Sequence, residues 1–565
     1  MKFKSITIKN FRNYENVQLD LTNKNIIFGR NDFGKTNFLH ALRFLFEPRI
    51  RNKGFDKSDY HKKETSKPIS ILLELDISEE NNDNNKFIRA KVGGDIEFSE
   101  GSFFIKLEGI YDESKQIGNP VLKWGGHLDE LKDVGQKGIY SDLDEIFEVV
   151  YLHPNLSPNE LFKKHRNLLY KDKDTSENEE IEKAIDNLNT VISSDARVNS
   201  INDLLTKNYK EIRKENVAIE LKSEHEVNGI FNHLVPYIKD STNNDGNLYP
   251  TSGDGRQKIL AYALTNLIEE RKLEDKGIKK ITIFLIEEVE NSLHPSMQQV
   301  VSRNLFQTNK ELYPYLFLTT HSEHMFMYMD QVNLIRIFRD QNDSYTNKSY
   351  FYQVPKGFKE TRKTFNELLS QTLFYDRVLL VEGMSEKILF EAVIEKIAEE
   401  KTEVLPKLEE ISILSVEGIG FEDYIGILQS IGIDVIVKTD NDIRKLKEET
   451  KVSTLGINRC KKIYNLKLFQ DNDEYREQPF SYDENIDIND KSERDSLKKK
   501  IFKKYKTSIE TWKKANIYIS EIELEEDLYS ILPNDILNDK EFEGDFIGYL
   551  QQSKKENMNT FVNKY

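Results

Sequence analysis

Cysteine is almost absent from this chain of 565 residues, which contains only Cys460. A single cysteine forms no internal disulfide and no cysteine-based zinc cluster, as is typical of proteins in a reducing compartment. Long apolar runs are also absent, since none approaches the ~18 residues of a membrane span. The start MKFKSITIKN alternates like a strand and does not open a signal peptide. We therefore expect a cytoplasmic protein with no membrane partner.

An excess of positive charge is lacking too. Lys+Arg 81 against Asp+Glu 97 gives a formal net charge of −16, which is atypical of a protein that binds nucleic acid with its whole surface. Residues 491–514 depart from this balance, with ten Lys and Arg against three Asp and Glu. Such a block is either a solvated helix face or a local nucleic-acid contact. The length predicts two or three domains.

One phosphate-binding motif is clear. The apolar IIF leads into GRNDFGKT, residues 29–36, and then into the helical pattern NFLHALRFLF. A strand, GxxxxGK[ST] and a helix form the context of a P-loop. Gly29 and Gly34 let backbone N–H groups turn toward a phosphate at a helix N-terminus. In this motif Lys35 neutralises the β- and γ-phosphates, and Thr36 offers its hydroxyl to Mg²⁺.

Three further segments fit nucleotide chemistry. The strand ITIFLI ends in Glu287 and Glu288, which are placed to hold a metal and to polarise water. LFLTTHS puts His321 at the end of another strand, where it can contact a γ-phosphate. TSGDG opens a helical pattern, so Ser252 and Gly253 can meet a phosphate. Taken alone, that string is equally typical of a plain turn.

In this order the four segments resemble the ATP-binding-cassette (ABC) ATPases, in the branch that contains the SMC, Rad50 and RecF proteins. FRNYENV resembles the N-terminal segment of that branch. The resemblance implies ATP with Mg²⁺ bound between two heads, and hence a homo-oligomer. TSGDG stands where LSGGQ is usual, and Glu287 where Asp is usual. The nucleotide-binding positions implied are Arg12, Gly29, Asn31, Gly34, Lys35, Thr36, Asn37, Ser252, Gly253, Glu287, Glu288 and His321. Thr36 and Glu287 are its metal positions.

After about residue 350, alternating strands and helices predict a second α/β domain with a parallel sheet. Its apolar strands end in carboxylates, in RVLLVEG, ISILSVEGIG, DVIVKTDND and NIYISEIELEEDL. Because parallel strands bind ligands at one shared edge, these acids can converge, together with Glu386 one helical turn after Glu382. Converging carboxylates require counter-charge. All-oxygen ligation favours two Mg²⁺ or Mn²⁺ ions, which would support phosphodiester hydrolysis.

EGMSE and DND resemble the Toprim domain of topoisomerases, DnaG-type primases and OLD (overcoming lysogenization defect) nucleases. An ABC-type head followed by Toprim resembles the OLD family. The chain resembles the nuclease subunits of Gabija antiphage systems more closely still, through DKSDYHK, YPTSGDGR, EGMSEKILF, KTDND and YLQQSKK. It implies cleavage of double-stranded DNA in antiviral defence, a dimer or tetramer, and a UvrD-like helicase partner.

The same resemblance assigns catalytic positions. They are Glu382, Glu386, Asp440, Asp442, Glu523 and Lys554. The acids among them are the metal ligands, and the lysine is a cation for the transition state. The pattern does not separate Glu523 from its neighbours Glu521, Glu525 and Asp527.

We therefore predict an α/β chain in which an ABC-type ATPase head with a helical dimerisation insert precedes a Toprim domain. The expected ranges are 1–154 and 236–348 for the head, 155–235 for the insert and 349–565 for Toprim. The hypothesis for function is an ATP-regulated, metal-dependent DNA endonuclease. The alternatives are a RecF- or SMC-like DNA-binding repair protein without cleavage, and strand transfer of the topoisomerase or primase type. Whether ATP activates or restrains cleavage is left open.

Overall fold

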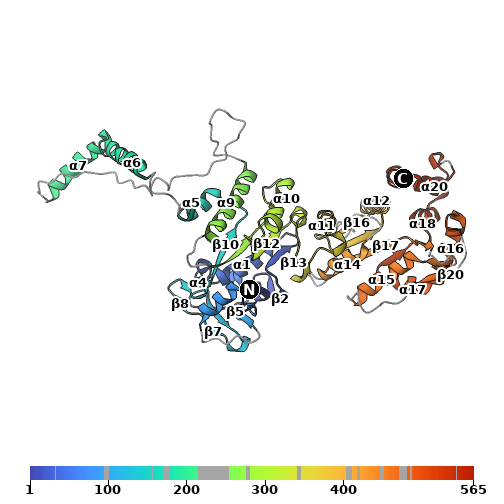
Figure 1. Ribbon diagram of the computed structural model, residues 1–565, viewed down its shortest axis with the longest axis horizontal. Helices are drawn as coiled ribbons and strands as arrows, with labels where there is room; N and C mark the ends of the chain where they lie inside the picture. Colours follow the sequence, from blue (N-terminus) through green and yellow to red (C-terminus); the bar gives the residue numbers. More distant parts are fainter. Residues whose placement is uncertain are drawn as a thin grey trace. The chain divides into compact units, whose positions relative to one another are not determined.

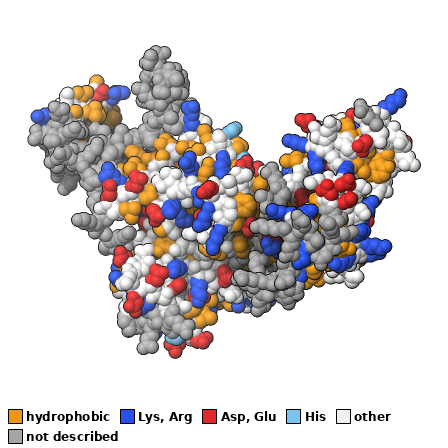
Figure 2. Space-filling model, turned by 45° about the vertical axis from the view of Figure 1, so that its right-hand side comes forward, with side chains coloured by type: hydrophobic (Ala, Val, Ile, Leu, Met, Phe, Trp, Pro, Cys, Tyr) orange, Lys and Arg blue, Asp and Glu red, His pale blue; other side chains and the backbone are white. Residues whose placement is uncertain are grey.

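The computed structural model in Figure 1 describes residues 1–31, 33–93, 101–155, 157–169, 178–213, 253–274, 280–339, 345–401, 410–416, 420–445, 451–469, 480–483, 487–542 and 544–565. The chain forms two compact units. The larger comprises Met1–Leu152, Lys280–Asn291 and Pro295–Tyr565, and the smaller comprises His153–Lys279 and Ser292–His294. No helix in the described ranges is long and apolar enough to cross a membrane. On the face drawn in Figure 2, acidic and basic side chains are interspersed with apolar ones.

The first strands of the chain form an antiparallel sheet with the order β2-β1-β4-β5-β6-β7. Alternate residues are buried, as in ISILLELD of β4, because only one face of the sheet packs on the core. The strands are β1 (Lys2–Phe11), β2 (Tyr14–Asp20), β4 (Ile69–Asp76), β5 (Ser102–Asp112), β6 (Ile117–Gly125) and β7 (Lys132–Asp133).

A second, mainly parallel sheet carries the phosphate-binding motif. Its order is β10-β11-β12-β3-β13-β14, and only the β13–β14 pair is antiparallel. The central strands are buried on both faces, which explains the unbroken apolar runs ITIFLI and LFLTT. The strands are β3 (Lys24–Phe28), β10 (Phe147–Leu152), β11 (Ile281–Ile286), β12 (Leu316–Thr320), β13 (Val332–Arg339) and β14 (Tyr345–Tyr352).

Helix α1 (Lys35–Phe46) packs against both sheets and shares one core with them. The ring of Phe38 contacts Phe317 of the parallel sheet, and the ring of Phe44 contacts Phe11 of the antiparallel sheet. The remaining elements of this head are α2 (Pro48–Arg51), η1 (Lys57–Asp59), η2 (His61–Lys63), α3 (Asp83–Val92), η4 (Leu128–Glu130), β8 (Gln136–Lys137), β9 (Tyr140–Ser141), α4 (Leu143–Ile146), α10 (Pro295–Arg303), η6 (Asn304–Thr308) and η7 (Glu323–Phe326).

In the part of the chain that the structure describes, the smaller unit is helical. Its described helices are α5 (Pro158–Leu169), α6 (Asn178–Ser193), α7 (Ala196–Arg213) and α9 (Asp254–Glu274). Helix α5 packs on α9 around Leu161, Leu264 and Ile268. The unit thus includes α9, whose residues the sequence analysis placed in the second part of the head. The helical insert at 155–235 stays a prediction, as does its role in dimerisation.

The C-terminal α/β domain is built on four parallel strands in the order β16-β15-β17-β21. Its strands are β15 (Arg377–Val381), β16 (Ile411–Ser415), β17 (Asp434–Thr439) and β21 (Ile517–Ile519), with a small antiparallel sheet of β18 (Arg444–Lys445), β19 (Lys451–Ser453) and β20 (Ser481–Asp483). Its helices are η8 (Lys356–Phe358), α11 (Arg362–Ser370), α12 (Met384–Glu400), α14 (Phe421–Ser430), α15 (Leu455–Phe469), α16 (Lys491–Lys504), α17 (Lys506–Lys514), α18 (Leu524–Ile531), α19 (Asn534–Leu537), η10 (Lys540–Phe542), α20 (Phe546–Gln552) and α21 (Lys554–Lys564).

Two arginines of the head contact the C-terminal α/β domain within the larger unit. Arg336 of β13 donates to the Gly432 carbonyl at 2.9 Å and to the Asp376 carboxylate at 2.5 Å. Arg30, inside the phosphate-binding motif, pairs with Glu410 at 3.0 Å. Asp376 directly precedes β15, and Glu410 directly precedes β16. Charge-assisted hydrogen bonds therefore join the head to the start of the C-terminal sheet.

Candidate nucleotide and metal sites

The phosphate-binding motif lies between β3 and α1, and its two glycines occupy positions that other residues cannot adopt. Gly29 has φ +148°, and a Cβ there would lie 2.2 Å from the carbonyl oxygen of Ile337. Gly34 has φ +102°, and a Cβ there would lie 2.2 Å from the side-chain nitrogen of Asn13. Only glycine combines these dihedral angles with such close approach. The motif therefore holds a tight loop at the N-terminus of α1.

Lys35 is buried inside this loop. Its Nζ donates to the carbonyl oxygens of Gly29 at 3.0 Å and Arg30 at 2.7 Å. A cavity of about 460 Å³ opens above it and is lined by Asn31, Gly34, Lys35, Thr36, Asn37, Glu288 and His321. The cavity joins a buried ammonium group to a helix N-terminus, and both favour a phosphate group. These residues fit a nucleotide.

The ends of β11 and β12 supply acids and an imidazole to the same place. The Thr36 hydroxyl donates to Glu287 Oε1 at 2.5 Å, and the Tyr151 hydroxyl donates to the other oxygen of Glu287. The His321 Nε2 lies 3.9 Å from Glu288 Oε1. A hydroxyl beside a carboxylate is the oxygen-donor set that Mg²⁺ takes in P-loop proteins, so these residues fit a nucleotide-bound metal.

The lining of this cavity does not include Arg12 or Gly253, two other predicted nucleotide contacts. Arg12 pairs with Asp59 at 2.9 Å and donates to the side chain of Asn37 at 3.0 Å, so it is positioned next to α1. Gly253 is described and exposed just before α9, whereas Ser252 lies outside the described residues. The pairing of these two residues with a second head stays a prediction.

In the C-terminal sheet, β15 and β17 are paired in parallel, and the acids that follow them meet. Glu382 comes directly after β15. Its Oε1 accepts hydrogen bonds from the Thr439 hydroxyl and from the backbone N–H of Asp440 at 2.8 Å. Asp440 comes directly after β17, and its Oδ1 accepts from the Ser520 hydroxyl at 3.0 Å. Adjacent strand ends thus bring Glu382 and Asp440 together.

Glu386 lies in the first turn of α12 and points back toward this edge. Its carboxylate accepts a hydrogen bond from the Gly383 N–H at 2.8 Å. Burial raises the pKa of Glu386 to about 7, and the negative charge of Glu382 adds to the shift. Burial likewise raises the pKa of Asp440 to about 8, with the charges of Glu386 and Glu382 adding to it and Lys438 opposing it. These carboxyl groups lack sufficient positive charge around them.

Arg459 of α15 supplies positive charge to two other acids at this edge. Its guanidinium pairs with Glu382 and, at 3.3 Å, with Asp442. Asp442 is thereby tied to the same group of acids as Glu382. We name Glu382, Glu386, Asp440 and Asp442 the strand-end acids.

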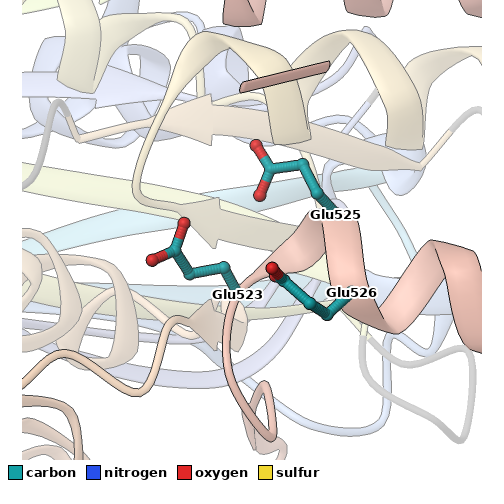
Figure 3. A group of neighbouring side chains, drawn as sticks. All are labelled: Glu523, Glu525 and Glu526. Carbon is teal, nitrogen blue, oxygen red and sulfur yellow. The ribbon is translucent and has the colours of Figure 1, made fainter. Parts of the chain in front are cut away.

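A second group of acids surrounds the start of α18, and Figure 3 shows its members. Glu523 caps the helix, and Glu525 and Glu526 lie in its first turn. One carboxylate oxygen from each lies within 4.8 Å of the others. Oxygens of Glu525 and Glu526 are buried without a hydrogen-bond partner. Since a buried carboxylate oxygen requires compensation, this group has the chemistry to hold a cation.

Two lysines pair with the second group of acids. Lys498 of α16 is almost fully buried and donates to Glu523 at 2.9 Å. Burial acts to raise the pKa of Glu523, but the hydrogen bond and charge of Lys498 outweigh it and lower that pKa overall. The Lys554 ammonium lies 3.4 Å from Glu525 and 3.7 Å from Glu523. Its pKa is lowered by burial but raised overall by Glu525, Glu523 and Asp440.

The other acids of this segment that could be metal ligands have different surroundings from Glu523. Glu521 is exposed, and Asp527 pairs with Lys438 at 3.1 Å. Glu525 is 2% exposed, so it is the most deeply buried acid of the segment. The structure therefore adds Glu525 and Glu526 to the predicted Glu523. A run of acids in a sequence indicates the presence of such a group, but helix geometry decides which members turn inward.

Arg459 and Lys498 were missed by sequence reasoning. Arg459 lies in a helix with other basic residues, and Lys498 lies in the basic block 491–514. Nothing in the local pattern distinguishes a basic residue that turns toward carboxylates from one that faces water. The one available signal was the excess of acids at strand ends, which requires cations from elsewhere in the chain.

Comparison with known proteins gives the class of the protein. Residues 373–442 match the family described as "Overcoming lysogenization defect protein-like, TOPRIM domain", and residues 1–117 and 126–326 match "AAA ATPase domain". The latter ranges include the nucleotide site, and the former includes the strand-end acids. An ATPase head joined to a TOPRIM domain of this type defines an ATPase-coupled nuclease. The predicted α/β fold, with an ATPase head before a TOPRIM domain, is confirmed.

Similar sequences narrow the class. Endonuclease GajA from Bacillus cereus (strain VD045) is 41% identical over 100% of this chain and 95% of its own length. The Old nuclease of Escherichia phage P2 is 23% identical over 78% of this chain and 77% of its own. The DNA replication and repair protein RecF of Lactococcus lactis subsp. lactis (strain IL1403) is 50% identical over 10% of this chain and 16% of its own. The chain belongs to the GajA family of OLD-like endonucleases, and the predicted resemblance is confirmed.

Proposed function

We propose that this chain is an ATP-regulated, divalent-metal-dependent endonuclease that nicks or cuts double-stranded DNA in antiviral defence. The observation that carries the proposal is the gathering of the strand-end acids at one edge of the C-terminal sheet. The similarity to a protein named endonuclease over the whole chain supports the same reaction. The proposal includes a cytoplasmic location, assembly into a dimer or tetramer, and a UvrD-like helicase as partner.

The metal ligands in this proposal are the strand-end acids and Glu523. Two Mg²⁺ or Mn²⁺ ions held by these residues would supply positive charge to the attacking and leaving oxygens of a phosphodiester. Burial of Glu386 and Asp440 supports this role, because their raised pKa values indicate carboxylates that gain a counter-ion when a cation binds. Thr439 and the backbone of Asp440 orient Glu382 through hydrogen bonds to its Oε1.

Lys554 has the role of a cation near the transition state. Its side chain is half exposed, and its ammonium reaches Glu523 and Glu525 from the start of α21. An exposed ammonium beside the metal ligands can approach a DNA phosphate, whereas the buried Lys498 is occupied by Glu523. Lys498 is thus a support for Glu523, and Lys554 is the cation available to substrate.

The head binds ATP with Mg²⁺ in this proposal. Lys35 and the N-terminus of α1 bind phosphate, and Thr36 and Glu287 hold the metal. Glu288 polarises water, and His321 contacts the γ-phosphate from the end of β12. The nucleotide controls the nuclease through the head that carries it.

Plasmid cleavage with Mg²⁺ or Mn²⁺ and increasing ATP tests the proposal. Wild-type protein, Lys35→Ala and Glu382→Ala are compared. We expect Glu382→Ala to lose cleavage and keep ATP binding, because its site lies outside the nucleotide cavity. We expect Lys35→Ala to lose the response to ATP. Cleavage by Glu382→Ala at the wild-type rate would show that the metal site has been assigned wrongly.

A RecF-like repair protein without cleavage is the alternative from another class. It requires the C-terminal acids to be structural, dispersed residues, yet four of them gather at one sheet edge. The RecF similarity, moreover, covers 10% of the chain. Strand transfer of the topoisomerase type is a third candidate, and trapping a covalent DNA adduct would favour it. The nuclease proposal predicts no such adduct.

A further inference from the structure

Arg459 lies among the strand-end acids and binds residues from two strand ends. Its Nη1 pairs with Glu382 and donates to the Thr439 hydroxyl, and its Nη2 lies 3.3 Å from Asp442 Oδ2. The side chains of Arg459 and Glu382 are 18% and 15% exposed. A guanidinium group that is largely removed from water and held by two carboxylates forms strong, directional hydrogen bonds.

The helix that carries Arg459 is fixed against the loop after β17. The N–H of Gly456 donates to the carbonyl of Asp442 at 3.0 Å. A Cβ at Gly456 would lie 2.3 Å from the carbonyl oxygen of Asp440, so the close approach requires glycine. Asn458 exchanges two hydrogen bonds with the backbone of Phe480. The position of Arg459 is therefore set by its backbone and does not depend on the side chain alone.

Arg459 occupies one oxygen of Glu382 and one of Asp442, each of which could also bind a metal. Glu382 Oε1 accepts from the Thr439 hydroxyl, from the Asp440 N–H and from Arg459. A guanidinium has no lone pair to offer a metal, and it keeps its charge at any working pH. It therefore competes with a divalent ion for Glu382 Oε1 and Asp442 Oδ2, and it cannot leave by losing a proton.

We propose that Arg459 is a positioning residue that takes the place of a cation in the metal-free site. It holds Glu382 and Asp442 near their binding positions, and divalent ions displace it from them. The inference rests on the proposed function, since it treats Glu382 and Asp442 as metal ligands. Its consequence is that Arg459 lowers the affinity of the site for metal and stabilises the metal-free fold.

Titration calorimetry with Mn²⁺, in the absence of DNA and nucleotide, tests this inference in the full-length protein. Asp440→Asn identifies the heat that comes from the TOPRIM site. We expect Arg459→Met to bind Mn²⁺ about tenfold more tightly than wild type, the size expected when one charge-assisted competitor is removed. Arg459→Lys keeps the positive charge but loses the paired N–H donors of the guanidinium group. Its Mn²⁺ affinity should therefore lie between those of wild type and Arg459→Met.

The matched control is Lys462→Met, one turn further along α15. Lys462 pairs with Glu422 at the surface, and its loss changes the net charge by the same amount. We expect its Mn²⁺ affinity to equal that of wild type. Thermal unfolding gives a second measurement. In EDTA, Arg459→Met should unfold at a lower temperature than wild type, and Mn²⁺ should remove that difference.

The two proposals fail in different ways. If wild type binds Mn²⁺ and Arg459→Met binds it no more tightly, the role of Arg459 is refuted and the nuclease proposal stands. If wild type and Asp440→Asn give the same isotherm, the metal site itself is refuted, and the role of Arg459 is refuted with it. If Arg459→Met does not fold, an affinity of Arg459→Lys no higher than that of wild type refutes the role of Arg459.

Discussion

The nucleotide site and the TOPRIM acidic site occupy the same place in two different sheets. Each lies where parallel strands end, β3, β11 and β12 in the head and β15 and β17 in the C-terminal domain. The nucleotide site offers a buried ammonium group and the N-terminus of α1. The acidic site offers carboxylates that are held by basic side chains. The nucleotide site is suited to a phosphate group together with its metal ion, and the acidic site to cations alone.

The difference shows that the sheet fixes where a site lies but not its charge. The sheet edge provides an open place at which loops from neighbouring strands meet. The residues that follow each strand then set the sign of the charge. In the head β3 is followed by glycines and a lysine and β11 by two acids, whereas in the TOPRIM domain both β15 and β17 are followed by acids. The two sites are therefore expected to fail independently when single residues are changed.

The largest expected effect is the loss of DNA cleavage in Asp440→Asn. The amide keeps the shape of the side chain but removes a charged metal ligand, so we expect cleavage to fall about 10³-fold or more, as for loss of an essential electrostatic group. Plasmid nicking in Mn²⁺ measures it, and ATP binding should remain at the wild-type level. Glu399→Gln, an exposed change on α12, is the control. Wild-type cleavage by Asp440→Asn would contradict the assignment.

The reciprocal change is Lys35→Ala. Loss of the buried ammonium should weaken ATP binding by about 100-fold, the size of a charge-assisted bond in a closed site. A fluorescent nucleotide titration measures this, and Mn²⁺ binding at the TOPRIM site should be unchanged. Lys53→Ala removes an exposed lysine of the head and should bind ATP normally. Equal losses of ATP and Mn²⁺ binding in Lys35→Ala would mean that the two sites are not independent.

The acidic site should bind metal more tightly as pH rises. The pKa of Glu386 is raised to about 7 and that of Asp440 to about 8, so near neutrality the metal-free protein holds protons that a cation must displace. Below pH 7 we expect Mn²⁺ affinity to fall by about tenfold per pH unit for each proton displaced. Calorimetry in two buffers of different ionisation enthalpy measures the proton release. A constant affinity between pH 6 and 8.5 would oppose this account.

The smallest expected effect is a difference in stability between Glu523→Gln and Glu521→Gln. Glu523→Gln leaves the almost fully buried Lys498 without its carboxylate partner, and we expect a loss of about 1–3 kcal/mol of stability. Glu521→Gln changes an exposed residue and should alter stability by less than about 0.5 kcal/mol. Urea unfolding of the metal-free proteins measures both. Equal stability of the two variants would show that the Lys498 pair contributes little.

The prediction of the nucleotide site rests on a local motif, because the parts of that motif are adjacent in the chain. Gly29, Gly34 and Lys35 lie within seven residues, and the loop and helix N-terminus follow from that spacing. Glu382 and Asp440 were predicted to meet because each directly follows an apolar strand. Their meeting depends on the pairing of β15 with β17, and the structure shows that pairing. Both predictions used only residues that directly follow a strand in the sequence.

The counter-charges could not be predicted in this way. Lys498 and its neighbours Lys499 and Lys500 look alike in the sequence, yet Lys498 is buried against Glu523 while the other two are exposed. Which residue turns inward depends on how α16 packs, and no local pattern records that. The extent of the helical unit could not be predicted for the same reason. Helices α5 and α9 pack together although they lie far apart in the chain.

The sequence by itself determined the two chemistries of this protein, because a P-loop and a strand that ends in acids are both patterns of consecutive residues. Only the tertiary structure decided which basic side chains accompany the acids. Arg459 reaches Glu382 from a helix 77 residues away, and Lys498 reaches Glu523 from another helix. A buried carboxylate needs a positive charge that is close in space, not close in the sequence. Any basic residue that the fold brings near can therefore supply it.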